Sequence, residues 1–252
     1  MDLSIITDGW THDEEDEAEN VRKVVGIDGA EKVQVRIRNG LLQWEMDGRP
    51  DGTRPHGCPS MLEHCRRLRE EGDLDELTVE AVEELVQELF DYYQRSQALF
   101  HLGDFPRVLA DLEHCLGVLG ILRDSVPRES FQFEQYRPGL LVDKARAGML
   151  LEVQNGDLRE AFIALNEGIR QVEEFYLEHE LDEDIPESTE RQVLIELRRS
   201  LRERHNVPLN DRELLRSLRL EQELAIHYED YEMAARLRDK INSLKHRIHA
   251  QD

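Results

Sequence analysis

The sequence predicts a mainly α-helical protein with a small β-hairpin region near its amino terminus. From residue 61 onward, apolar residues recur three and four positions apart, as on one face of a helix. Before that point, residues 33–46 alternate apolar and polar side chains around Asn39-Gly40, which is typical of a β-hairpin. The chain of 252 residues is long enough for one large domain, or two to three small ones, with a real core.

The composition restricts the class of partner. The formal net charge is -23, which repels both a phosphate backbone and an anionic membrane surface. Nucleic-acid binding is therefore not expected unless a local basic patch opposes the global charge. The three cysteines, the lack of a signal-peptide pattern and the lack of a long apolar run predict a cytoplasmic protein with no membrane segment.

The first 60 residues form two predicted regions. Residues 1–20 hold eight acidic and no basic residues and are expected to be a disordered acidic tail, either solvated or functional. Residues 21–60 are expected to form the β-hairpin region and a Gly/Pro-rich loop. Within the hairpin, Asn39 and Gly40 are the expected turn residues, both with positive φ, and Val24 and Val25 are candidates for a third strand.

The loop of residues 47–60 is the candidate ligand site. Two arginines in it could hold a carboxylate or phosphate, which supports a hydrolase or nucleotide-handling enzyme as an alternative function. The same residues could instead form a rigid corner whose arginines pair with acidic helices. The candidate ligand residues are Asp47, Arg49, Asp51, Arg54 and His56.

A metal site in this region is considered and not predicted. His56, Cys58, His64 and Cys65 are possible zinc ligands, but the spacing of the two cysteines is not that of a zinc knuckle. No phosphate-binding loop, nucleophile elbow or metalloprotease motif occurs in the chain. The sequence therefore predicts no catalytic residue and no cofactor.

Residues 61–208 are predicted to be a body of helical hairpins. The expected helices cover residues 61–71, 78–102, 105–126, 138–154, 157–181 and 188–205, with Thr78 as an N-cap. Gly103-Asp104 and Gly156-Asp157 begin two similar stretches, each with small or medium residues seven positions apart. This pattern resembles tetratricopeptide repeats, although the spacing is 53 residues and not 34. Plain antiparallel helix pairs in a bundle are the alternative.

The last region, residues 209–252, is predicted to be a helical hairpin. Its helices are expected at residues 211–226 and 231–249, with Asn210 and Asp230 as N-caps. In the second helix, Ala234, Leu237, Ile241, Leu244 and Ile248 repeat at spacings of three and four. This repeat predicts one narrow seam between two helices.

In the second helix an aromatic-Glu pair (Tyr231-Glu232) is followed by Ala234-Ala235, then by the triplet Leu237-Arg238-Asp239 and by apolar residues at helical spacing. This pattern closely resembles the UVR motif of the bacterial excision-repair proteins, and the order of segments resembles that of bacterial UVR-motif proteins. In the first helix Gln222 departs from the family pattern, which places an apolar residue there. The resemblance implies a protein-binding hairpin, as in excision repair and in adaptors of Clp-type proteases. The matching residues, and hence the candidate partner-binding set, are Tyr231, Glu232, Ala234, Ala235, Leu237, Arg238, Asp239, Ile241 and Leu244.

The leading hypothesis is accordingly a protein-protein interaction adaptor or scaffold that is not an enzyme. Its hairpin would contact another protein or a second copy of the chain. A DNA-repair accessory that touches nucleic acid is a further alternative.

Overall fold

The computed structural model describes residues 7, 9–72, 77–125, 131–205 and 211–249. The chain divides into two compact units, Met1–Leu140 and Leu141–Asp252. The division falls inside one helix, so the helical body predicted for residues 61–208 is shared between the two units. Among the described helices, none combines the length and apolar character needed to cross a bilayer.

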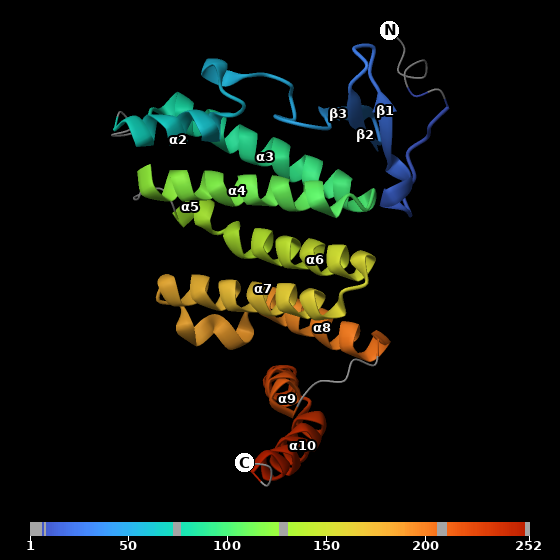
Figure 1. Cartoon of the computed structure of the whole chain (residues 1–252), viewed down its shortest axis with the longest axis vertical. Coiled ribbons are helices and arrows are strands. Elements are labelled where there is room, and N and C mark those ends of the chain that lie inside the picture. Colours follow the sequence, from blue (N-terminus) through green and yellow to red (C-terminus); the bar gives the residue numbers. More distant parts are fainter. Residues whose placement is uncertain (1–6, 8, 73–76, 126–130, 206–210, 250–252) are drawn as a thin grey trace. The chain divides into compact units, whose positions relative to one another are not determined.

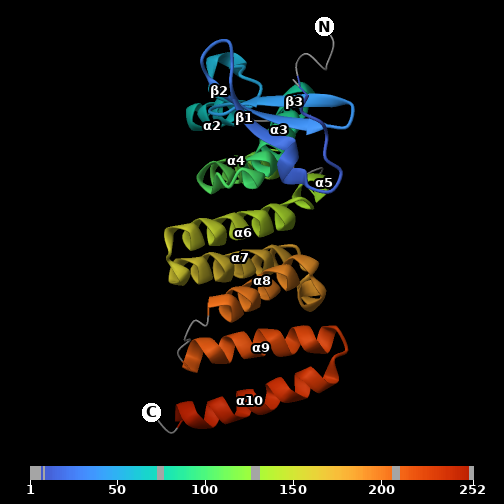
Figure 2. The same cartoon turned by 90° about the vertical axis from the view of Figure 1, so that its right-hand side faces the viewer.

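Unit 1 contains a three-stranded antiparallel sheet in the order β1-β2-β3, next to helix α3 (Figures 1 and 2). The additional strand that the sequence suggested at Val24 and Val25 is β1, which pairs with β2. The elements of this unit are η1 (Glu17–Asn20), β1 (Val21–Val25), β2 (Glu31–Ile37), β3 (Gly40–Glu45), η2 (Pro55–Gly57), α2 (Met61–Glu71), α3 (Val79–His101), α4 (Phe105–Ser125) and α5 (Phe131–Glu134).

The β2–β3 hairpin is present, but its turn differs from the predicted one. Ile37 pairs with Gly40, so Arg38 and Asn39 occupy the turn, and neither Asn39 nor Gly40 has a positive φ. The Nη1 of Arg36 donates to the carbonyl oxygens of Ile37 and Gly40, both at 2.6 Å. This bridging guanidinium satisfies carbonyls on both sides of the turn, which helps a turn without left-handed residues to close.

Residues 10–20 make defined contacts, although a disordered tail was expected for residues 1–20; residues 1–6 and 8 of that segment lie outside the described residues. Asn20 is buried and exchanges two hydrogen bonds with the backbone of Asp13, at 2.7 and 2.8 Å. The Trp10 ring lies 4.1 Å from the Arg22 guanidinium, and Arg36 donates to the Trp10 carbonyl at 3.1 Å. The net charge of the segment suggested solvation, whereas these polar contacts fix it against the strands.

A buried carboxylate joins the helices of unit 1. Glu88 of α3 is fully buried and accepts from the first amides of α2, Met61 N at 2.7 Å and Leu62 N at 3.0 Å. His114 of α4 lies 2.8 Å from the same carboxylate. Burial opposes ionisation of Glu88, but these hydrogen bonds outweigh it and hold its pKa below the usual value. Three helices therefore depend on one charged side chain.

Unit 2 contains the remaining helices, and the predicted helix pairs are present. The turns at Gly103 and Gly156 have the same geometry. Each glycine has a positive φ, and the backbone N–H of the aspartate after it donates to the carbonyl oxygen five residues earlier in the chain. The elements are most of α6 (Arg137–Asn155), α7 (Leu158–Glu178), η3 (Asp182–Glu187), α8 (Thr189–His205), α9 (Asp211–His227) and α10 (Tyr231–His249).

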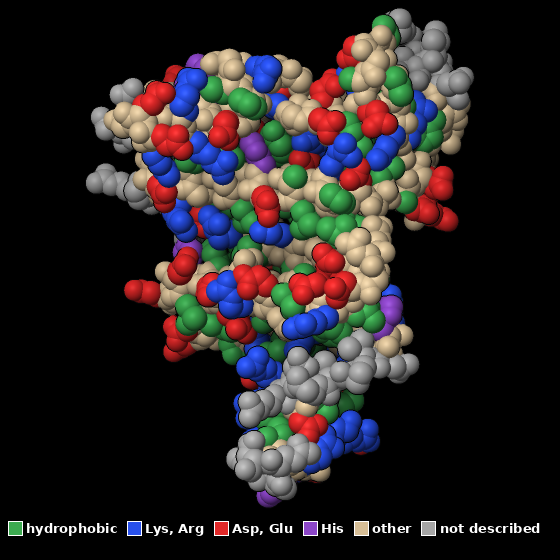
Figure 3. All heavy atoms as spheres, in the orientation of Figure 1, with side chains coloured by type: hydrophobic (Ala, Val, Ile, Leu, Met, Phe, Trp, Pro, Cys, Tyr) green, Lys and Arg blue, Asp and Glu red, His purple; other side chains and the backbone are tan. Residues whose placement is uncertain are grey.

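Small residues allow α6 and α7 to approach closely. A Cβ atom at Gly168 would overlap the side chain of Ala145, whereas one at Gly148 would make only an ordinary contact with Ala164. Gly168 belongs to the stretch that begins at Gly156-Asp157, and it is one of the small residues seven positions apart in that stretch (Ala161 and Gly168). On the face drawn in Figure 3, acidic and basic side chains are intermixed within each unit.

Candidate functional site: the carboxy-terminal hairpin

The apolar residues of the predicted motif form the hairpin's own core. Ala234, Leu237, Ile241 and Leu244 are all less than 10% exposed and pack with residues of α9. Ala235, next to this seam, is partly buried. The α9 residues in this core are Leu218 and Ala225, with Leu214 and Leu215 at its edge. These motif residues therefore hold α9 and α10 together and are not presented to a partner.

The two ends of the hairpin are fixed by polar contacts. At the turn, Glu229 has a positive φ of 57°, and Asp230 caps α10 by accepting from Met233 N at 2.9 Å, as predicted. At the open end, Arg247 donates two hydrogen bonds to Asp211, at 2.9 and 2.5 Å. The Asp211 carboxylate raises the pKa of Arg247 above its usual value. The hairpin is thus closed at both ends.

The polar and aromatic residues of the motif point outward. Glu232 pairs with Arg236 at 2.6 Å, and Arg238 pairs with its neighbour Asp239 at 3.0 Å, all on exposed side chains. Tyr231 is 66% exposed. These contacts between neighbours on one helix leave the outer face of α10 open to another molecule.

Two further exposed apolar residues lie beside Tyr231 in the sequence. Ile226 is 52% exposed and Tyr228 is 58% exposed. We call Ile226, Tyr228 and Tyr231 the tip residues, because they flank the turn between α9 and α10. Sequence reasoning did not single out Ile226 and Tyr228. Their position after the last seam residue of α9 was the available signal.

Hydrogen bonds and ion pairs connect the hairpin to α8 within unit 2. Arg202 donates to Ser217 at 2.7 Å and to Glu221 at 2.5 Å. Tyr228 donates to the Gln192 side chain at 3.2 Å. Near Gln192, Arg191 also pairs with α9, as described below. One face of α9 therefore packs on α8, while the tip residues stay largely exposed.

The comparisons with known proteins bear on this hairpin. The family model described as the UvrB/uvrC motif matches residues 212–247. The match covers nearly all of α9 and α10 and confirms that the chain carries a carboxy-terminal UVR motif, the type of hairpin that typically mediates protein contacts. Neither the comparison with curated proteins nor the comparison with solved structures gave a match.

The loop of residues 47–58 uses one of its two arginines internally. Arg49 is 8% exposed and lies near three carboxylates, those of Glu84 at 3.2 Å, Asp51 at 3.3 Å and Glu88 at 3.4 Å. This placement matches the rigid-corner interpretation, in which an arginine pairs with an acidic helix. Arg54 is exposed, so of the two arginines it is the one that remains accessible to a ligand.

The other candidate residues of the loop are dispersed. Asp47 is exposed and pairs with Arg107 of α4 at 3.1 Å. His56 has a positive φ of 50° and its ring stacks on His64 at 4.1 Å. Cys58 and Cys65 are buried free thiols. Within the described parts of the chain, no group of three or more His, Cys, Asp or Glu residues is placed to hold a metal ion.

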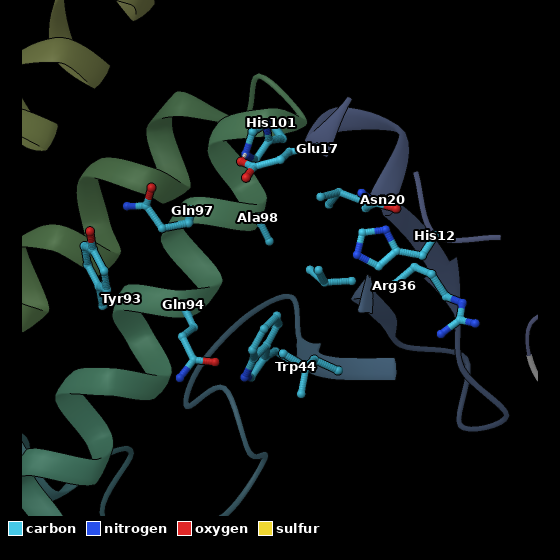
Figure 4. A pocket seen from close by; sticks show the side chains of 13 residues that line it. His12, Glu17, Asn20, Arg36, Trp44, Tyr93, Gln94, Gln97, Ala98 and His101 are labelled. Atoms are coloured by element: carbon cyan, nitrogen blue, oxygen red, sulfur yellow. Dashed lines mark ion pairs between the residues drawn. The ribbon is translucent and has the colours of Figure 1, made fainter. Parts of the chain in front are cut away.

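Unit 1 also contains a pocket between the sheet and α3, which sequence reasoning did not find (Figure 4). Its volume is about 330 Å³, and Trp44 and Tyr93 contribute aromatic walls. His101 and Glu17 form an ion pair at 3.5 Å at its edge. The other labelled residues are His12, Asn20, Arg36, Gln94, Gln97 and Ala98.

Proposed function

We propose that this chain is an adaptor that binds another protein through its carboxy-terminal hairpin and does not act as an enzyme. The observation that carries the proposal is the UVR motif on α9 and α10, folded around its own core with aromatic tip residues exposed. Exposed tyrosines are frequent anchors of protein interfaces, because a rigid ring buries a large area at a small entropy cost.

The internal core explains why the exposed tip is the expected contact. A hairpin of about 40 residues has a small core, and here the seam residues already bury one another. A partner is therefore not needed to cover the seam. It would instead bury the tip residues and the outer charges of α10, so we expect these residues to determine affinity.

We infer the class of partner from the systems in which the motif occurs. UVR hairpins occur in excision-repair proteins and in adaptors of Clp-type proteases, which makes a component of one of these systems, or a second copy of this chain, the proposed partner. The helix pairs of the body, whether or not they are tetratricopeptide-like, would hold a second protein.

The test compares two variants of the full-length chain. Tyr228→Ala/Tyr231→Ala removes both tip aromatics, and Tyr136→Ala removes a tyrosine of unit 1 that is 47% exposed. Proteins captured from the native cell by wild type and by Tyr136→Ala are expected to be lost from the tip variant. Analytical ultracentrifugation of the same proteins reports self-association. Equal capture and equal sedimentation for all three proteins would refute the proposal.

A catalytic role for the loop of residues 47–58 is the second candidate. The exposed Arg54 beside the strained His56 favours it, since unusual backbone conformations often occur at functional sites. Because Arg49 stabilises the fold, Arg54→Ala is the sharper variant. Loss of the cellular function in Arg54→Ala, with capture of partners unchanged, would favour the enzyme over the adaptor.

A further inference from the structure

The carboxy-terminal quarter of the chain differs in charge from the rest. Residues 189–252 contain 13 Lys and Arg and 12 Asp and Glu, which gives a net charge of +1. Residues 1–188 have a net charge of −24, and the two parts sum to the −23 of the whole chain. The strongly acidic character therefore lies before α8. Any surface of this chain that attracts an anion is most readily built from α8, α9 and α10.

Such a surface exists beside the hairpin, inside unit 2. A groove of about 440 Å³ runs between α7, α8 and α9. Ile169 and Leu220 contribute apolar surface to it. The basic residues that line it are Arg170 of α7, Arg198 of α8, and Arg216 and Arg219 of α9, and we call this feature the arginine groove.

The two acidic residues of the groove share one arginine beside it, which offsets one of their two negative charges. Glu173 and Glu223 both line the groove, and both pair with Arg191, at 2.6 and 2.7 Å. Burial opposes the charge on Arg191, but the two carboxylates more than offset it and raise its pKa. The four arginines that line the groove therefore outnumber the one carboxylate charge that Arg191 leaves uncompensated.

The arginines of the groove are in a different position. Arg170 pairs with Glu167 and Glu174 on its own helix, and Arg198 is only 7% exposed and is also engaged within the protein. Arg216 and Arg219 are exposed, so their guanidinium groups are the ones that a ligand can reach. Guanidinium groups that share one groove repel one another, and an anion between them would remove that cost.

We propose that the arginine groove binds a carboxylate-rich segment of the protein partner. Each guanidinium offers a planar fork that matches a carboxylate, and the partly exposed Leu220, with the buried Ile169 behind it in the lining, contributes apolar surface. A nucleic acid is the less suitable ligand, because it would need many phosphate contacts in a strongly acidic chain. The inference rests on the proposed function and adds a chemical requirement for the partner, acidic residues interspersed with apolar ones.

Fluorescence anisotropy with the full-length protein tests this directly. The probe is a fluorescein-labelled peptide of Glu-Glu-Leu repeats, titrated at low ionic strength. Arg216→Glu/Arg219→Glu is expected to weaken binding by about tenfold for each arginine, the effect of losing one charge-assisted contact. Lys240→Glu/Lys245→Glu on α10 makes the same change in net charge away from the groove, and it should weaken binding by less than about threefold.

A conservative variant separates recognition from charge. Arg216→Lys/Arg219→Lys keeps the charge but lacks the forked donors, so binding should weaken by about threefold to tenfold. Circular dichroism would verify that each variant is folded; if the glutamate variant is not, the lysine variant decides. Equal weakening by the α10 control would overturn the proposal, because binding would then follow net charge alone.

Competition and sedimentation identify the ligand. Displacement of the peptide by equimolar pyrophosphate or a single-stranded oligonucleotide would overturn the proposal in favour of a phosphate ligand. Self-association that Arg216→Glu/Arg219→Glu abolishes would make a second copy the occupant and would also overturn it. If the peptide does not bind while Tyr228→Ala/Tyr231→Ala still abolishes capture, only this inference fails and the adaptor function stands.

Discussion

Replacing Glu88 with glutamine should destabilise unit 1 strongly, although the two side chains have nearly the same shape. In the native protein both carboxylate oxygens accept hydrogen bonds, from the amides of Met61 and Leu62 and from His114. A glutamine would place an NH2 group where one of these oxygens accepts. At least one donor would then face another donor inside a site with no access to water.

The expected magnitude follows from these contacts. A buried backbone amide without an acceptor costs about 1–3 kcal/mol. The variant also removes the negative charge 3.4 Å from the buried Arg49, although Glu84 and Asp51 still pair with that arginine. We therefore expect Glu88→Gln to lower the free energy of unfolding by about 2–4 kcal/mol, a large part of the stability of an ordinary domain.

Urea unfolding followed by tryptophan fluorescence measures this loss selectively, because the chain has two tryptophans, Trp10 and Trp44, and both lie in unit 1. The matched control is Glu84→Gln on the same helix. Glu84 is 35% exposed, so its pairing with Arg49 is expected to contribute less than about 1 kcal/mol. If Glu88→Gln and Glu84→Gln unfold at the same urea concentration, the proposed role of Glu88 is wrong.

The pH dependence provides a second measurement on the same pair of proteins. The pKa of Glu88 is lower in the folded protein than its usual value of 4.5. Its ionisation therefore stabilises the fold fully above pH 4.5, and this stabilisation is lost as pH falls through the lower folded value. The difference between wild type and Glu88→Gln should narrow below about pH 4. A difference that stays constant down to acid unfolding would contradict this assignment.

Three further predictions concern other parts of the chain. Gly168→Ala should destabilise the α6–α7 pair by about 1–3 kcal/mol through overpacking. Gly148→Ala should leave the stability of the pair unchanged or raise it by up to about 1 kcal/mol. Hydrogen exchange of peptides from α6 and α7 compares the two variants. Burial raises the pKa of Cys65 to about 11 and also raises that of Cys115. Neither thiol should therefore react with iodoacetamide at neutral pH until urea unfolds unit 1. Rapid alkylation of the native protein would disprove their burial. Glu229→Gly should stabilise the hairpin by about 0.5–1 kcal/mol, because glycine adopts the positive φ without strain; faster hydrogen exchange in α9 and α10 of this variant would contradict the turn geometry.

Local patterns in the sequence were sufficient for the secondary structure and for the motif. Capping residues and apolar spacing place Thr78 at the start of α3 and Asp230 at the start of α10, and both side chains make the expected hydrogen bonds. The spacing of Ala234, Leu237, Ile241 and Leu244 predicts a single seam, and these residues form it. Such features depend on neighbours within a few positions, which the sequence displays directly.

Contacts between distant residues were decided only in the tertiary structure. Glu88 was one acidic residue among 55. Nothing near it in the sequence indicated that it would accept hydrogen bonds from the backbone amides of α2 and from a histidine of α4. The ordered segment of residues 10–20 depends on side chains of β1 and β2, although its composition suggested disorder. Arg216 and Arg219 were not singled out in the sequence, and only the tertiary structure places them in one groove with Arg170 and Arg198. Burial, ion pairing and the shape of a groove depend on which residues meet across the fold, and local spacing carries no information about that.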